Sequence, residues 1–214
     1  MTASSGLKFF STPPHSCSYL ADEQAITLFA DPEASITNAT YHQLSMYGFR
    51  RSGNYIYKPQ CPACHACVSV RVPVNAFKAN RQQQRVWKKN QDLTVRKVNA
   101  AYVQAHYDLY ARYISLRHAD GDMYPPSVAQ YVSFLFADWS ETWLYEFYHD
   151  DKLLAVAVCD GLKNGLSAVY TFYDVAAEQR SLGTYAVLWQ IAEAQKMELG
   201  FVYLGYWVKH SRKM

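Results

Sequence analysis

Residues 143–173 read WLYEFYHDDKLLAVAVCDGLKNGLSAVYTFY, and this stretch decides the fold. It contains three segments rich in aromatic and aliphatic residues, at 143–148, 153–159 and 166–173. Short polar turns separate the segments, and Asn164-Gly165 in the second turn is a strong hairpin signal. The pattern therefore predicts three consecutive antiparallel strands.

Helices are predicted on both sides of these strands. Upstream, apolar residues recur every three or four positions, as on one face of a helix: Tyr102, Ala105, Leu109, Tyr113 and Leu116. That helix should end before Gly121, and a shorter helix should follow over 127–137, after two prolines. Downstream, residues 182–199 predict a helix that stops at Gly200, and residues 201–208 predict one more strand.

This order of elements matches the core of the GNAT-type acyltransferase fold. In that fold the last strand pairs beside the last hairpin strand and then splays away from it, which opens the acyl-donor cleft. We therefore expect an α+β protein with a GNAT-like acyltransferase domain over residues 98–214. A match of topology predicts a fold and not an activity.

The first half of the chain reads differently. Residues 41–74 predict short strands and turns, with Arg51-Ser52-Gly53-Asn54 as a turn before the strand-like Tyr55-Ile56-Tyr57. A helix is expected over 76–91, where neither Gly nor Pro occurs. Because no long flexible linker precedes residue 98, we expect residues 1–97 to form a smaller α/β domain packed on the second one.

The net charge of the 214 residues is only +3, but the charge is segregated along the chain. The window 50–97 holds eleven basic residues and one acidic residue, Asp92, so it carries +10 while the remaining residues sum to −7. A basic block in an otherwise acidic chain favours a polyanionic partner bound at one place. The alternative is an ordinary solvated face rich in lysine and arginine.

Spacing within the predicted helix gathers these cations on one side. At about 100° per residue, five of them fall within an arc of roughly 100°: Lys78, Arg81, Arg85, Lys88 and Lys89. Such a row suits a phosphate backbone better than a compact anion. Tyr55 and Tyr57 lie upstream and offer bases a stacking surface, with packing inside a strand as the alternative.

Four of the five cysteines are candidates for a metal site. Cys61, Cys64 and Cys67 follow the spacing C-x2-C-x2-C, which suits zinc or an iron–sulfur cluster, and Cys17 or His65 is available as a fourth ligand. The other interpretation is a reduced turn without metal. Cys159 lies in an apolar strand and is expected in the core. An odd cysteine count without a signal peptide argues against a disulfide framework.

Composition excludes several classes of protein. The longest uninterrupted apolar run, residues 153–159, is seven residues long, far short of the roughly 20 that a membrane helix needs. Residues 1–16 lack the apolar core of a secretory signal, so we expect a cytoplasmic protein without membrane contact. Because half of the residues are apolar and 15% are aromatic, global disorder is excluded.

Taken together, several motifs resemble the aminoacyl-tRNA–protein transferase family. In the first half they are YGFRRSGNYIYKP at 47–59, the cysteine run at 61–67 and the basic run at 81–90. In the second half they are RHADGDM at 117–123, YTFYD at 170–174, RSLGTY at 180–185 and GYWV at 205–208. The resemblance runs from about residue 18 to the end of the sequence and is nearest to the bacterial branch, the aspartate/glutamate leucyltransferases.

The resemblance implies an enzyme that moves an amino acid from its tRNA to the N-terminal Asp or Glu of a protein. That transfer marks the protein for degradation by the N-end rule (N-degron) route. The bacterial branch implies leucine as the donor, with arginine as the alternative. The implied partners are an aminoacyl-tRNA and a protein that begins with Asp or Glu.

The sequence departs from the family pattern at three places. Eukaryotic arginine-transferring members carry a second cysteine three positions after the first, where this chain has Leu20. They also carry adjacent cysteines where this chain has Gln60-Cys61, so their kind of iron–sulfur cluster is less expected here. Members usually continue past a segment such as 211–214 with a short basic and aromatic tail.

The chemistry needs orientation, removal of one proton and stabilisation of an oxyanion, and it requires no cofactor and no covalent intermediate. Asp174 is our candidate for holding or deprotonating the acceptor ammonium, with capping of a turn as the alternative. Glu146 is a second candidate catalytic residue. Tyr170 is a third, and together with Tyr173 it is a candidate for lining the acyl pocket, with core packing as the alternative.

Basic side chains are the candidates for binding the two substrates. An arginine fork fits the acceptor carboxylate, and Arg50, Arg51 and Arg71 are the candidates. The candidates for tRNA phosphate are Arg81, Arg85, Lys88 and Lys89, and Arg180 is a further substrate-binding candidate.

Two other functions compete with this interpretation. One is an acetyl-CoA-dependent N-acetyltransferase, whose fold binds pyrophosphate with a pattern that Arg180 and Gly183 keep. Tyr185 stands where that pattern has a small residue, so its bulk should obstruct the pyrophosphate and no CoA is expected. The other is a non-enzymatic, metal-stapled RNA-binding protein, which leaves the second half without a role.

Overall fold

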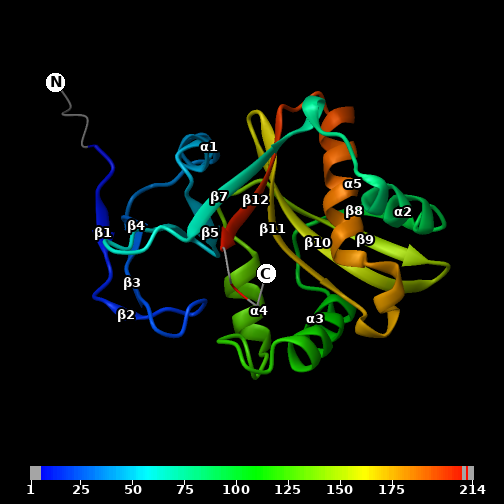
Figure 1. The fold of residues 1–214 in the computed structure, drawn as a ribbon, viewed down its shortest axis with the longest axis horizontal. Coiled ribbons are helices and arrows are strands. Elements are labelled where there is room, and N and C mark those ends of the chain that lie inside the picture. The colour runs from blue at the N-terminus through cyan, green and yellow to red at the C-terminus, as the bar shows by residue number, and fades with distance from the viewer. Residues whose placement is uncertain (1–5, 209–210, 212–214) are drawn as a thin grey trace.

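The computed structural model describes residues 6–208 and residue 211. It contains a six-stranded sheet in the order β7-β12-β11-β10-β9-β8, a four-stranded sheet in the order β1-β4-β6-β5 and a small pair, β2-β3. Figure 1 shows the smaller sheet beside the larger one, with helices packed around the larger sheet. Residues 212–214, after which the family tail was expected, lie outside the described residues.

The three predicted hairpin strands form the centre of the large sheet. They are β9 (Thr142–His149), β10 (Lys152–Leu162) and β11 (Gly165–Tyr173), and each pairs antiparallel with the next. Side chains of β10 alternate between two cores, because Val156 and Val158 face one side while Ala155, Ala157 and Cys159 face the other. The prediction of three antiparallel strands is confirmed.

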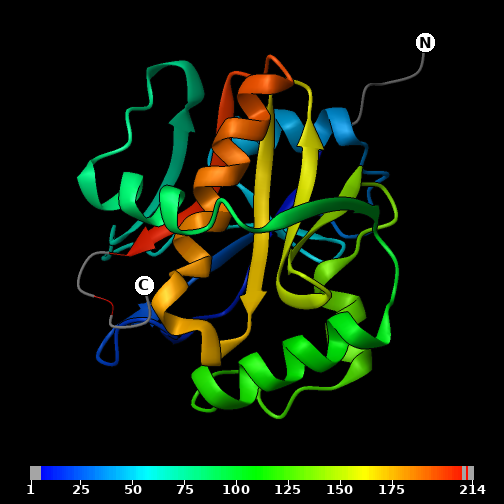
Figure 2. The same cartoon turned by 90° about the vertical axis from the view of Figure 1, so that its right-hand side faces the viewer.

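The helices cover both faces of this sheet. α3 (Gln104–Arg117) and α4 (Val128–Leu135) pack on the face of Val156, and α5 (Leu182–Lys196) packs on the face of Ala157. Figure 2 shows α5 lying along the strands. The predicted helix positions are confirmed, but three of the five positions on the predicted apolar face of α3 are exposed, namely Tyr102, Ala105 and Leu116. Tyr102 precedes the helix and Leu116 is 69% exposed, whereas Tyr110 and Ile114 are fully buried.

The last strand pairs and splays as predicted. β12 (Phe201–Val208) runs parallel to β11 over only three residue pairs, the last of which joins Ser167 to Tyr203. A bulge at Gly205, whose φ is +86°, then carries β12 along β7 (Cys67–Pro73) as far as Cys67. Beyond Ser167, β11 therefore lacks a β12 partner, and the two strands diverge as in the GNAT-like arrangement.

The large sheet takes strands from both halves of the chain. β7 pairs with β12 at one edge, and β8 (Thr94–Asn99) pairs with β9 at the other. The expected boundary at residues 97 and 98 falls inside β8. The division into domains 1–97 and 98–214 stays a prediction, and the sheet joins the two halves by backbone hydrogen bonds.

The remaining elements of the first half form the smaller unit. Its sheet contains β1 (Phe9–Ser11), β4 (Thr27–Ala30), β6 (Tyr55–Pro59) and β5 (Arg50–Ser52), and its helix is α1 (Asn38–Met46). The strands β2 (His15–Ser16) and β3 (Gln24–Ala25) pair beside them. Gly53 makes the predicted turn with φ +55°, and a side chain there would collide with the Ser133 carbonyl of α4.

The cationic helix is shorter than predicted. A short 3-10 turn, η1 (Val74–Ala76), precedes it, and α2 itself runs over Arg81–Lys89. Asn80 caps α2 in a reciprocal capping box with Gln83, so four residues lie between the end of η1 and the start of the helix. Lys78 therefore lies outside the helix, and the helical face carries four cations rather than five. No helix among the described residues has the length and hydropathy of a membrane span.

Candidate active site

The divergence of β11 from β12 exposes a segment of β11 whose side chains belong to a dense aromatic group. Tyr170 and Tyr173 of β11 contact Tyr113 of α3, with ring centroids 6.4 Å and 4.8 Å from the Tyr113 ring. The Tyr170 hydroxyl is buried and has no hydrogen-bond partner among the described residues, and burial raises its pKa. Burying a hydroxyl without a partner costs free energy, so the Tyr170 hydroxyl is available to form a hydrogen bond with a polar atom of a ligand.

Two residues that the sequence did not single out as site residues complete this group. His118, at the end of α3, lies with Nε2 3.2 Å from the Tyr113 hydroxyl, and burial raises the pKa of that hydroxyl, with Tyr173 raising it further. The motif RHADGDM contains His118, and the motif YTFYD contains Tyr170 and Tyr173. The fold brings these two motifs together. Tyr113 lies in neither motif, and the helical period of the sequence assigned it to the core.

Asp174 follows directly after β11 and is already engaged twice. Its Oδ1 accepts a hydrogen bond of 3.0 Å from the Ala176 N–H, which caps the turn η2 (Val175–Arg180). Its Oδ2 lies 2.7 Å from the Lys152 Nζ, and this hydrogen bond is the main cause of a lowered Asp174 pKa. The carboxylate therefore holds an ammonium group in this structure, and its low pKa makes it a weak base.

Glu146 lies on the same sheet face as α3 but within the core. Its Oε1 is 2.6 Å from Nε2 of His106 on α3, and the Glu146 and His106 side chains are 10% and 1% exposed. Glu146 is on β9, two strands away from β11. The structure therefore does not bring Glu146 together with Tyr170 and Asp174.

The cationic face of α2 leads toward this site. Arg81, Arg85 and Lys88 are exposed, and Lys89 donates a hydrogen bond of 2.7 Å from Nζ to the Gln179 carbonyl of η2. On its other side, α2 packs on α5 through Trp87 and Tyr185, whose ring centroids are 5.6 Å apart. The basic row therefore ends against the segment that follows Asp174.

Arg180 makes a different contact from the one that its motif suggested. Its guanidinium forms two parallel hydrogen bonds to Asp92, of 2.9 Å and 2.8 Å, and its side chain is 17% exposed. Tyr185 was expected to obstruct a pyrophosphate, but its side chain is buried in the core against Trp87 and Phe147. The physical reason given for excluding CoA therefore does not hold for Tyr185.

The three arginines that were candidates for the carboxylate have different surroundings. Arg51 pairs with Asp160 at 2.6 Å, and neither side chain has exposed surface. Arg50 is buried and donates to the carbonyls of Ser45, Phe49 and Val70. Arg71 is exposed and stacks on Phe201 at 4.4 Å. As placed, Arg50 and Arg51 hold the fold together, and Arg71 alone of the three is open to a ligand.

The structure gathers the four candidate metal-binding cysteines at one pocket. Cys17, Cys61, Cys64 and Cys67 all line a pocket of about 410 Å³ at the end of β12, together with Glu23 and His65. Burial raises the pKa of the Cys67 thiol, and the other three cysteines raise it further. Four soft sulfur donors at one pocket fit zinc or an iron–sulfur cluster chemically. As placed, however, the described residues form no group of three or more donors in metal-binding geometry.

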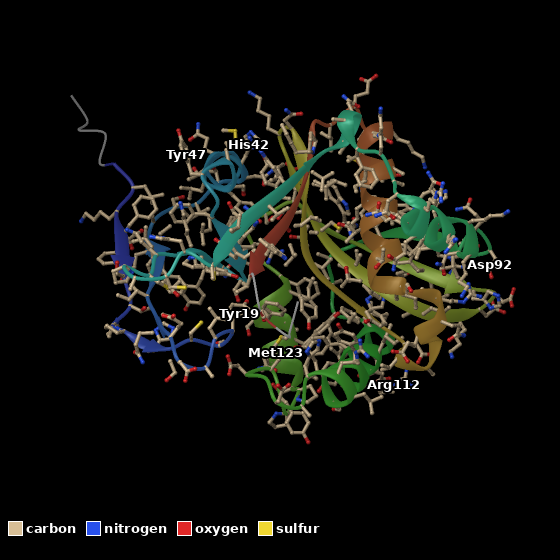
Figure 3. All side chains as sticks on the ribbon, in the orientation of Figure 1. Tyr19, His42, Tyr47, Asp92, Arg112 and Met123 are labelled. Carbon is tan, nitrogen blue, oxygen red and sulfur yellow. The ribbon has the colours of Figure 1, made fainter. Side chains whose placement is uncertain are left out.

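The cysteine pocket adjoins the loop that follows α3. Tyr19 is 42% exposed, and its partial burial raises its pKa, with Cys67, Cys17 and Asp122 raising the pKa further. Figure 3 labels Tyr19, and it labels Met123, the neighbour of Asp122, on the loop that follows α3. The motifs of the first and second halves therefore meet beside this pocket.

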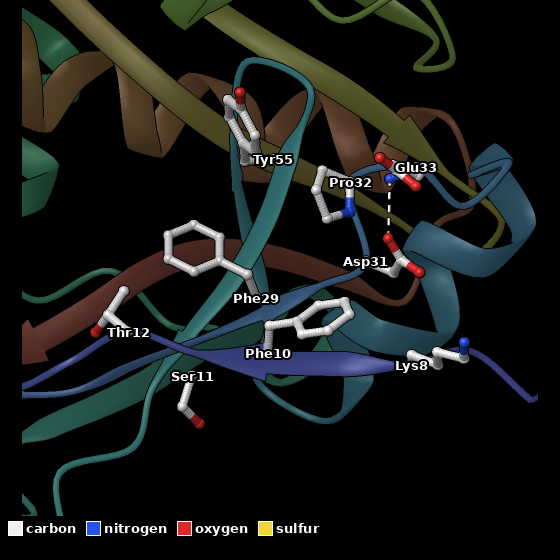
Figure 4. A pocket seen from close by; sticks show the side chains of 9 residues that line it. All are labelled: Lys8, Phe10, Ser11, Thr12, Phe29, Asp31, Pro32, Glu33 and Tyr55. Atoms are coloured by element: carbon white, nitrogen blue, oxygen red, sulfur yellow. Dashed lines mark hydrogen bonds between the residues drawn. The ribbon is translucent and has the colours of Figure 1, made fainter.

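A separate cavity of about 580 Å³ lies on the outer face of the smaller sheet. Figure 4 shows Phe10, Phe29 and Tyr55 around it, with Lys8, Asp31 and Glu33 at its rim. Tyr55 is 56% exposed, whereas Tyr57 is half-buried against Tyr206. The two tyrosines proposed as a base-stacking surface therefore differ, and only Tyr55 is exposed; base stacking itself stays a prediction.

Comparisons with known proteins support the family that the sequence motifs resemble. The family described as "Arginine-tRNA-protein transferase, N terminus" matches residues 15–85, and "Arginine-tRNA-protein transferase, C terminus" matches residues 105–214. An aspartate/glutamate leucyltransferase of Pseudomonas fluorescens (strain Pf0-1) is 57% identical over 214 residues, which is all of this chain and 91% of the relative. One from Stutzerimonas stutzeri (strain A1501) is 56% identical over the same span.

A solved structure supports the fold alone. The structure of L-PGS from Bacillus licheniformis aligns with a TM-score of 0.51 at 8% identity, over 78% of this chain and 50% of that one. The sequence motifs, the splayed strands and the two family matches lead to one assignment. The chain belongs to the arginine-tRNA-protein transferase family, in the branch of the aspartate/glutamate leucyltransferases.

Proposed function

We propose that this chain transfers leucine from leucyl-tRNA to the N-terminal Asp or Glu of proteins and so marks them for N-end rule degradation. The names of relatives 56–57% identical over the whole chain support the donor and the acceptor. Arginine is the alternative donor. We place the reaction in the cytoplasm, where charged tRNA is made, with no membrane and no CoA as partners.

One observation carries the proposal: the basic row of α2 ends at the segment that follows β11. Lys89 bonds to Gln179 of η2, the turn that directly follows Tyr173 and Asp174. A phosphate backbone lying along Arg81, Arg85 and Lys88 is thereby directed toward the aromatic group. Its 3′ end, which carries the amino acid, reaches the place where β11 and β12 diverge.

The residues of that place suit the reaction. The nucleophile is an α-amine with an ordinary pKa near 8, and the electrophile is the ester carbonyl of the aminoacyl-tRNA. Tyr170, Tyr173 and Tyr113 supply hydroxyls beside an apolar surface, which fits the leucyl group and a developing oxyanion. Asp174 supplies a carboxylate that holds ammonium, so we give it the role of positioning the acceptor amine. Glu146 remains a weaker catalytic candidate because it lies in the core with His106.

Among the arginine candidates, Arg71 is the one we propose for the acceptor carboxylate. It is exposed on β7, opposite Tyr203 of β12, whereas the Arg51 guanidinium is held by Asp160. An arginine fork recognises a carboxylate through two parallel hydrogen bonds, which distinguishes Asp and Glu from uncharged N-terminal residues.

We also propose that the cysteine pocket takes one zinc ion or an iron–sulfur cluster through Cys17, Cys61, Cys64 and Cys67. Such a group would staple the ends of β6, β7 and β12. Because the thiols are not yet in binding geometry, binding has to draw them together. This role is structural, and the transfer reaction itself requires no cofactor.

A transfer assay tests the function. It uses leucyl-tRNA and arginyl-tRNA with reporter proteins that begin with Asp, Glu, Lys or Ala. We expect transfer of leucine to the Asp and Glu reporters only. Transfer to Lys or Ala, or tight binding of acetyl-CoA in a parallel titration, would overturn the proposal.

A further inference from the structure

The end of α2 is joined to η2 by a set of contacts that the transfer reaction does not explain. We call it the α2–η2 clamp, and it consists of Lys89, Asn90 and Asp92 on one side and Gln179 and Arg180 on the other. Asn90 is fully buried, and its Nδ2 donates to the carbonyl of Val86 in α2 and to that of Arg180 in η2, at 2.9 Å and 2.8 Å. One side chain therefore ties the last turn of α2 to the end of η2.

The Arg180–Asp92 fork closes the clamp from the outside. Its two bonds, of 2.9 Å and 2.8 Å, are parallel, which fixes orientation as well as distance. Arg180 lowers the pKa of Asp92 mainly through this hydrogen bond, so the carboxylate is charged at neutral pH. His149 of β9 lies 3.2 Å from the same carboxylate. The fork joins two residues that are 88 positions apart in the sequence. It therefore fixes the end of α2 relative to η2, which a local helix cap would not do.

The clamp lies between the proposed tRNA contact and the proposed acyl site. On one side it holds the helix of Arg81, Arg85 and Lys88. On the other, Arg180 ends η2, and Ser181 then adopts a left-handed conformation from which α5 begins. Gly183 in the first turn of α5 lies so close to Tyr173 that a Cβ there would be 3.4 Å from the ring. A shift of the clamp would therefore move residues that touch Tyr173.

We propose that Asn90, Asp92 and Arg180 are positioning residues that set the tRNA-binding face of α2 in register with the acyl site. This inference rests on the proposed tRNA contact of α2. Arg180 then acts on the reaction through η2 and does not touch the substrate. Its motif alone would have suggested a phosphate contact instead. Because a misplacement of about 1 Å costs on the order of 100-fold in rate, a loosened clamp lowers turnover more than affinity.

The test uses Asp92→Asn and Arg180→Lys, which keep side-chain size or charge but lose the fork. We measure kcat and KM for leucyl-tRNA, and the Kd of the tRNA as a function of salt. We expect kcat to fall about tenfold or more, with the Kd and its salt slope within about twofold of the unmodified protein. Asp92→Glu keeps the carboxylate and should recover most of the turnover. His149→Gln removes the other neighbour of Asp92 and is the matched control, with no loss expected.

Three outcomes overturn the inference. An unchanged kcat in both fork variants shows that the clamp does not align the reaction. A parallel loss of tRNA affinity and salt slope shows instead that Arg180 contacts the tRNA itself. Equal loss in His149→Gln shows general damage, which a thermal unfolding scan of each variant also reports. A separate measurement tests the tRNA contact itself. If the Arg81, Arg85 and Lys88 variants leave the salt slope unchanged, α2 does not contact the tRNA, whatever the fork variants do to kcat.

Discussion

At the scale of single residues, the Tyr170 hydroxyl is the sharpest probe of the proposed site. A buried hydroxyl without a partner costs about 1–3 kcal/mol, so Tyr170→Phe should leave the free energy of unfolding unchanged or raise it. We expect the same variant to lower kcat about tenfold or more, because the lost hydroxyl meets the acyl group. Urea unfolding and single-turnover transfer measure the two effects. Full activity of Tyr170→Phe would assign the residue to core packing.

Asp174 allows a prediction in which stability and activity separate by pH. Its pKa is lowered in the folded protein, so its contribution to stability is present above the unfolded value of about 3.8 and is lost as pH falls through the folded value. Asp174→Asn should therefore be less stable than the unmodified protein at pH 7. The two proteins should be equally stable at a pH low enough to protonate Asp174 in both the folded and the unfolded state. Thermal unfolding from pH 7 down to about pH 2 measures the difference.

For the reaction, we expect Asp174→Asn to lower kcat more than it changes the Kd of leucyl-tRNA. An amide still caps Ala176, but it no longer holds an ammonium group. If Asp174→Asn transfers leucine at the normal rate, Asp174 serves only as a cap and as a partner of Lys152.

At the scale of elements, α2 is the part to test first. Its four cations, Arg81, Arg85, Lys88 and Lys89, are all exposed, but Lys89 is already bonded to η2. Replacing Arg81, Arg85 and Lys88 by alanine should weaken tRNA binding and reduce the slope of log K against log salt by about 2–3. The binding titration is repeated at several salt concentrations. A set of three exposed lysines away from α2, Lys8, Lys163 and Lys196, is the matched control, and an equal effect there would contradict a specific contact.

At the scale of the whole molecule, the Arg51–Asp160 pair joins the two sheets. Arg51 belongs to β5 of the small sheet and Asp160 to β10 of the large one, and Thr142 and the Leu135 carbonyl share the same network. Breaking a fully buried pair leaves an unpaired charge, so Asp160→Asn should lower the free energy of unfolding by about 3–5 kcal/mol. Urea unfolding measures it. Lys196→Ala, which removes an exposed pair, should cost about 0–1 kcal/mol, and a similar loss in both would contradict the prediction.

The cysteine pocket makes a second prediction at this scale. If it binds zinc, protein purified without chelator should contain about one metal ion per chain, and chelation should lower the melting temperature. Cys61→Ser should abolish the metal content, whereas Cys159→Ala, in the core, should not. Elemental analysis under anaerobic conditions decides between zinc and iron. Metal-free protein with an unchanged melting temperature would assign the pocket to a reduced turn.

Local pattern was enough to predict most of the second half. Runs rich in aromatic and aliphatic residues, with Asn-Gly in one of the turns, predicted β9, β10 and β11, and the 201–208 strand was predicted with the bounds of β12. Helix α2 was placed too long, because cation spacing does not show where a helix begins, whereas the Asn80–Gln83 capping box does. Leu116 fitted the helical period but is exposed, since the period does not say which face meets the sheet.

By itself, the sequence determined the element order, the GNAT-like class, the family and the basic segment, because each depends on residues close together in the chain. Only the tertiary structure decided which charges are available. Arg50 and Arg51 are buried, Arg180 is held by Asp92, and Arg71 is open. It alone also brought His118 to Tyr113 beside Tyr173, and the cysteines to one pocket. Burial and pairing between distant segments fix the role of a charged or polar side chain, and these are properties of the folded chain.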